Sequence, residues 1–183
     1  MSAPVLQADR SAQRRPALAA VTAGALDALI VALWFAVAGT VGAWVWSRVT
    51  TLPKVAKAGG NATLSPDELV KQVGVDGWFF VIAMVGGLLS GIVLLAWRRR
   101  DPLLMVVAVV LGGALASWLM IHVGLALGPG KELVALRGKP DGAVVSTQLR
   151  LHANGMVWIW SMGAALGALA YIWVLGRPEP DRG

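Results

Sequence analysis

The chain has 183 residues, of which 57% are hydrophobic and 14% charged, and its formal net charge is +6. The charged share is about half that of an average soluble domain, and the mean hydropathy is +0.68, so a water-soluble globule and a disordered chain are both excluded. The sequence has no cysteine, which excludes disulfides, thiolate metal sites and iron–sulfur clusters within this chain.

Four apolar stretches follow one another, and each is long enough to cross about 30 Å of hydrocarbon as a helix. They cover residues 17–46, 77–97, 103–127 and 156–175. All nine prolines lie outside them, so each stretch is expected to form one unbroken span. The sequence therefore predicts an all-α integral membrane protein, a four-transmembrane-helix bundle with two long loops. Short tails, 1–16 and 176–183, flank the domain 17–175.

The first stretch has two interpretations. Arg14-Arg15, an apolar run and Ala36-Val37-Ala38 together are similar to a cleavable signal peptide. Hydrophobicity continues for two turns beyond Ala38, which favours a retained helix. Asp27 is the only ionisable residue in this stretch, and it is either an anchor at the cytoplasmic interface or a proton or ion site.

The first loop, residues 47–76, is expected to start loosely at Gly59-Gly60-Asn61. Ser65-Pro66-Asp67-Glu68 is typical of a helix start, because serine caps, proline fits the first position and acids complement the helix dipole. We expect a short helix from here to about Val73, lying on the membrane surface.

The turn between the second and third stretches predicts the orientation. It carries Arg98, Arg99 and Arg100, and a positive cluster of this kind stays cytoplasmic. Both termini are then cytoplasmic, both loops are external, and the expected location is the plasma membrane. Tryptophans close to the ends of the stretches are expected to form belts at the two interfaces: Trp44, Trp46, Trp78, Trp158 and Trp160 at the loop end, and Trp97 and Trp173 at the other.

The second loop, residues 128–152, contains the turn sequence Lys139-Pro140-Asp141-Gly142. The segments 133–136 and 143–147 flank this turn and are rich in aliphatic residues. A small β-hairpin is therefore expected in the second loop.

Small residues recur at helix-packing spacing in the spans. Gly87 and Gly91 lie four residues apart in the second stretch, and Gly163 and Gly167 do so in the fourth. Such pairs let helix backbones approach closely. They predict either packing within one molecule or a dimer interface.

Polar residues at the loop ends of the third and fourth stretches are the remaining site candidates. His122 and His152 could be paired haem ligands or interfacial residues with a hydrogen-bond partner, while a zinc site would need further ligands. Arg150, His152 and Asn154 alternate before the fourth stretch, where they either bind lipid headgroups or an acidic partner, or anchor the helix end.

Several short motifs together resemble a known family. They are Val75-Asp76-Gly77-Trp78-Phe79, Trp97-Arg98-Arg99-Arg100-Asp101-Pro102, His122-Val123-Gly124 and Leu149-Arg150-Leu151-His152-Ala153-Asn154-Gly155. With them, residues 76–171 resemble the actinobacterial membrane proteins catalogued as domain of unknown function 2567. Asn154 stands where the family pattern has proline. The resemblance implies a topology and a source, but no activity and no site residues.

The sequence contains no G-x-S-x-G, H-E-x-x-H or phosphate-loop pattern, so we expect neither catalysis nor a cofactor. The two loops carry a net charge of +3, which suits an anionic lipid or an acidic protein surface. We expect a non-catalytic accessory protein of a cell-envelope or respiratory complex. Its partners would be the lipid bilayer and a membrane protein or a second copy, but no nucleic acid. The alternative is a small transporter or channel component that uses Asp27.

Overall fold

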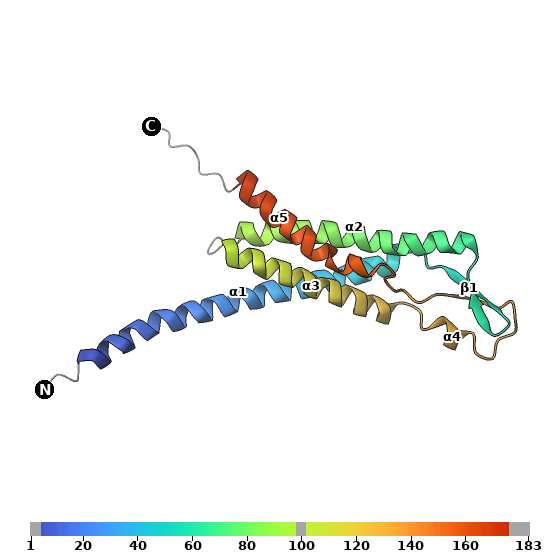
Figure 1. The fold of residues 1–183 in the computed structure, drawn as a ribbon, viewed down its shortest axis with the longest axis horizontal. Helices are drawn as coiled ribbons and strands as arrows, with labels where there is room; N and C mark the ends of the chain where they lie inside the picture. The colour runs from blue at the N-terminus through green and yellow to red at the C-terminus, as the bar shows by residue number, and fades with distance from the viewer. Residues whose placement is uncertain (1–4, 98–101, 176–183) are drawn as a thin grey trace.

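The computed structural model describes the backbone of residues 5–97 and 102–175 and the side chains of residues 24–97 and 103–174. Four long helices lie along one another, and short elements gather at one end, here called the loop end (Figure 1). In chain order the elements are α1 (Val5–Val49), β1 (Lys54–Ala58), β2 (Asn61–Thr63), α2 (Pro66–Trp97), α3 (Pro102–Leu127), α4 (Glu132–Ala135), β3 (Val144–Ser146), the 3-10 helix η1 (Asn154–Trp158) and α5 (Ile159–Leu175).

The prediction of four helices that are long and apolar enough to cross a membrane is confirmed. All four begin before the predicted stretches: α1 at Val5 rather than at residue 17, α2 at Pro66 rather than at 77, and α3 and η1 one and two residues early, at Pro102 and Asn154. The predicted cluster Arg98, Arg99 and Arg100 and the C-terminal tail lie outside the described residues.

The bundle is built from two closely packed pairs. α1 runs along α3, α2 runs along α5, and α3 also packs against α5, whereas α1 and α2 touch each other much less (Figure 1). Large side chains fill the centre, and Phe35, Phe79, Met120 and Trp160 are almost fully buried there. The weak α1–α2 contact leaves one side of the bundle open.

Of the tryptophans predicted to form a belt at the loop end, Trp44 and Trp158 are exposed, but the prediction is wrong for Trp46 and Trp160. These two side chains are 0% and 2% exposed and lie in the core. The indole N–H of Trp160 donates to the Met120 sulfur at 3.4 Å. Residues two apart in a helix lie on different faces. When Trp44 and Trp158 face outward, Trp46 and Trp160 therefore face the core.

The predicted surface helix is wrong as a separate element. The helix does begin at Pro66, as expected, but it continues without a break to Trp97. Its 32 residues extend about 48 Å, so the turns before Gly77 reach beyond an apolar layer of about 30 Å. Val75 and Phe79 are buried in the bundle, and this packing fixes the helix across the boundary where the loop was predicted to end.

The predicted hairpin in the second loop is also wrong. The segment before Pro140 forms the short helix α4, and β3 pairs with β1 of the first loop, with Val55 opposite Val145. β1 pairs on its other side with β2 across Gly59-Gly60, whose positive φ angles of 55° and 84° form a tight turn. The resulting antiparallel sheet has the order β2-β1-β3.

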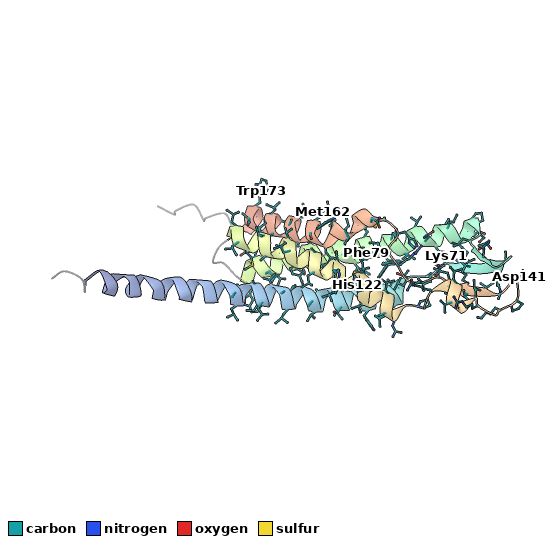
Figure 2. All side chains as sticks on the ribbon, turned by 60° about the horizontal axis from the view of Figure 1, so that its bottom comes forward. Lys71, Phe79, His122, Asp141, Met162 and Trp173 are labelled. Carbon is teal, nitrogen blue, oxygen red and sulfur yellow. The ribbon has the colours of Figure 1, made fainter. Side chains whose placement is uncertain are left out.

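The two loops therefore form one joined unit, here called the cap and defined as residues 50–65 and 128–153. Figure 2 shows Asp141 at the far tip of the cap and Trp173 at the opposite end of the bundle. Glu68, in the first turn of α2, ties the cap to the helix because its carboxylate accepts the backbone N–H of Lys54 at 2.8 Å. It also accepts a hydrogen bond from the Lys71 ammonium of its own helix at 2.6 Å. These two donors lower the pKa of Glu68, which lies outside the apolar part of α2.

Candidate functional site

Asp76 is the only charged side chain in residues 24–97 and 103–174 that is buried, with 8% exposure. Its carboxylate accepts the backbone N–H of His152 at Oδ1 and that of Ala153 at Oδ2, both at 3.0 Å. Burial of a carboxylate is costly unless donors surround it, and these charge-assisted bonds supply them. Asp76 thereby joins α2 to the end of the second loop, just before η1.

Residues of three helices hold the backbone around Asp76 in place. The Trp46 indole N–H of α1 donates to the carbonyl of Val75 at 2.9 Å. The Trp46 ring meets Phe79 edge-on, with 5.4 Å between centroids. Gly124 of α3 lies under the same ring, where an added Cβ would be 2.7 Å from it. The position of Asp76 is therefore fixed by buried packing rather than by an exposed loop.

His152 lies between Asp76 and Arg150. Its Nδ1 is 3.5 Å from Asp76 Oδ1, a distance of an ion pair more than of a good hydrogen bond. Its Nε2 is 3.5 Å from the Arg150 Nε on its other side. Of the predicted cluster, Arg150 and His152 are thus in contact, while Asn154 is exposed at the start of η1.

His122 lies apart from this arrangement. Its ring stacks on Trp118 of the same helix, with centroids 4.3 Å apart, and its Nδ1 is 2.8 Å from the Trp118 carbonyl oxygen. The side chain is exposed near the end of α3 (Figure 2). The two histidines therefore have different partners, and in the described part of the chain no three His, Asp or Glu side chains are grouped so that they could hold a metal ion.

The four predicted glycines meet within one molecule, between α2 and α5. A Cβ added to Gly87 would lie 2.5 Å from the Trp160 carbonyl oxygen, and one added to Gly163 would lie 2.7 Å from that of Met84. Gly91 and Gly167 abut backbone carbonyls of the facing helix in the same way. The close approach of α2 and α5 therefore depends on missing side chains at these positions.

Asp27 is half-buried on α1, far from Asp76 along the bundle. Its neighbour Ala28 lines a cavity together with Leu104, so Asp27 lies at the level where α3 begins.

Two of the serines in the middle of the helices, Ser90 and Ser161, have hydrogen-bond partners. The Ser90 hydroxyl donates to the Gly86 carbonyl at 2.7 Å and accepts the Trp34 indole N–H at 3.0 Å. The Ser161 hydroxyl donates to the Val110 carbonyl at 2.8 Å. The hydrogen-bonding groups of these two serines are thus used in tying helices together.

Sequence reasoning missed Asp76 as a site residue. The available signal was an acid immediately before an apolar stretch, within a motif that the family resemblance already used. That motif and the one around His152 are in direct contact in the fold. No family model, curated protein or solved structure matches the chain.

Proposed function

We propose that the chain is a non-catalytic accessory subunit of a cell-envelope or respiratory complex in the plasma membrane, and that the cap recognises a membrane-protein partner. The observation that carries this proposal is that both loops fold into one sheet, while Asp76 fixes the end of the second loop to α2. Loops of this length are usually functional or disordered, and these are ordered. A rigid cap is a suitable surface for binding a protein.

The surface of the cap indicates the chemistry of the partner. Leu133 and Val134 of α4 are 61% and 60% exposed, and Val144 of β3, which α4 contacts, is 57% exposed. Exposed lysines and arginines surround them, namely Lys131, Arg137 and Lys139. Exposed apolar groups with a polar rim are typical of protein interaction sites. We therefore propose a partner surface with an apolar centre and acidic residues around it.

Photo-crosslinking in intact cells tests this proposal. A benzophenone amino acid at Lys139 is expected to crosslink a specific membrane protein. Changing Leu133 and Val134 to Asp together should remove the crosslink, because both charges would be placed in the apolar centre. Both side chains are exposed, so the fold should be unaffected. Thr51→Asp, at an exposed position just after α1, adds a charge to the cap outside α4 and serves as the control. A crosslink that persists in the double variant would refute the assignment of α4 as the partner surface.

The proposed orientation places the cap outside the cell and the arginine turn inside. Because the chain has no cysteine, single cysteines can be labelled without background. A membrane-impermeant maleimide is expected to modify Ala58→Cys and Lys139→Cys in intact cells, but Asp101→Cys only after lysis. Labelling of position 101 alone in intact cells would reverse the orientation.

A further inference from the structure

An apolar groove opens between α1 and α2, two helices that touch each other much less than α1 touches α3 or α2 touches α5. It has a volume of about 430 Å³. Val41 and Val45 of α1 form one wall and Val81 and Val85 of α2 the other, with Trp160 as the floor. A second apolar hollow of about 390 Å³ shares Val41 and continues along α1.

The depth of the two-walled part corresponds to one membrane leaflet. On α2 its lining runs from Val81 to Ser90, which is about 14 Å of helix. Half of a hydrocarbon layer of about 30 Å is about 15 Å. A transmembrane helix of a partner would need a two-walled groove that extends through both leaflets. One acyl chain needs a groove that is only one leaflet deep.

The inner end of the groove offers no free polar group among Trp34 and Ser90, and a cation lies toward its loop end. At the inner end, the polar groups of Trp34 and Ser90 are hydrogen-bonded to each other. At the outer end, Arg48 lies three residues after Val45 and seven after Val41, so it continues the same helix face. Its guanidinium is exposed and stacks on the Trp44 ring, 5.7 Å from the centroid.

Trp78 has the matching place on α2. It is three residues before Val81 and hence on the groove face of that helix, and it is 45% exposed. Exposed tryptophans are enriched at the headgroup level of membranes. Arg48 and the two rings of Trp44 and Trp78 therefore stand where a lipid in this groove would have its headgroup.

We infer that the α1–α2 groove binds an anionic phospholipid, with one acyl chain between the two helices and the phosphate at Arg48. Charge complementarity selects this occupant, because an apolar slot one leaflet deep continues along α1 to the exposed cation Arg48. The inference rests on the proposed membrane insertion and orientation, but not on the proposed protein partner of the cap.

The full-length protein, reconstituted in phosphatidylcholine vesicles, allows a direct test. Spin-labelled phosphatidylglycerol and spin-labelled phosphatidylcholine are added in separate samples. For each lipid, the electron paramagnetic resonance spectrum gives the fraction whose motion is restricted by contact with the protein, and these two fractions are compared. The wild type is expected to prefer phosphatidylglycerol, and Arg48→Gln should reduce this preference by about fivefold, the factor for one basic residue at a membrane surface. Lys57→Gln, which removes one positive charge from β1 of the cap, is the matched control and should change nothing.

A second pair of variants tests the slot itself. Val41→Trp and Val85→Trp together fill the groove from its exposed walls and should remove the preference while Arg48 is intact. Leu166→Trp, which adds the same ring to the exposed face of α5, should not. An unchanged preference in Arg48→Gln, or in the filled groove, would overturn the inference. Disulfide-linked dimers of Val41→Cys in the bilayer would also overturn it, because a second copy would then occupy the groove.

These outcomes are distinct from failure of the proposed function. The lipid assay contains no protein partner, so a negative crosslinking result with the cap leaves its outcome unaffected. If the chain did not insert into the bilayer, neither labelled lipid would show a restricted fraction, in contrast to equal restriction of both lipids at an unselective surface.

Discussion

Asp76→Ala is expected to destabilise the protein by about 3 kcal/mol, because hydrogen bonds to a charged group are each worth about 1.5–3 kcal/mol and orphaned buried donors are costly. The variant leaves the N–H groups of His152 and Ala153 without their acceptor. The segment before η1 should then detach from α2 while the helices stay paired. Unfolding in mixed detergent micelles measures the loss of stability, and hydrogen exchange at residues 152 and 153 should become faster.

Two further variants distinguish this explanation from a general effect of charge. Asp67→Ala removes an exposed acid from the first turn of the same helix and should change stability by less than about 0.5 kcal/mol. His152→Ala keeps both backbone hydrogen bonds and loses only the two 3.5 Å side-chain contacts, to Asp76 and to Arg150, so its effect should be clearly smaller than that of Asp76→Ala. If Asp76→Ala were as stable as Asp67→Ala, the buried carboxylate would not be what holds the loop.

The four long helices could be predicted because their signal is local. Hydropathy and the positions of proline are read within about 20 residues, and the start of α2 at Pro66 follows from the residues around it. The end of the first loop could not be read in this way. Gly74 and Gly77 lower helix propensity only by about 1 kcal/mol each, and the burial of Val75 and Phe79 in the bundle decides the outcome.

The sheet and the Asp76 contacts depend on pairs of residues that are far apart in the chain. β1 and β3 pair across almost half of the sequence, with Lys54 opposite Ser146, and no local pattern in either strand names its partner. The partners of Asp76 are backbone N–H groups, which every residue except proline carries. The chemical identity of residues 152 and 153 therefore gave no indication of this role.

Gly91→Leu is expected to have the largest effect on the bundle, with a loss of about 3 kcal/mol or more, at the upper end of overpacking costs. An added Cβ would overlap the carbonyl group of Ala164 and would lie 2.8 Å from the amide nitrogen of Ala168. These are backbone atoms of α5, so they cannot turn away as a side chain could. The clash can be relieved only if α2 and α5 separate, which would also break the neighbouring contacts of Gly87 and Gly167.

Gly74→Leu is the matched control, since it adds the same side chain to the same helix at a position with no atom within 4 Å of the new Cβ. Size-exclusion chromatography and detergent unfolding of the two variants give the measurement. Gly91→Leu should aggregate or unfold early, whereas Gly74→Leu should behave as the wild type. A Gly91→Leu protein that stays fully folded but changes from dimer to monomer would move these glycines to an interface between copies. The backbone contacts of Gly91 within one molecule predict the opposite, because they put the cost of the leucine on the fold itself.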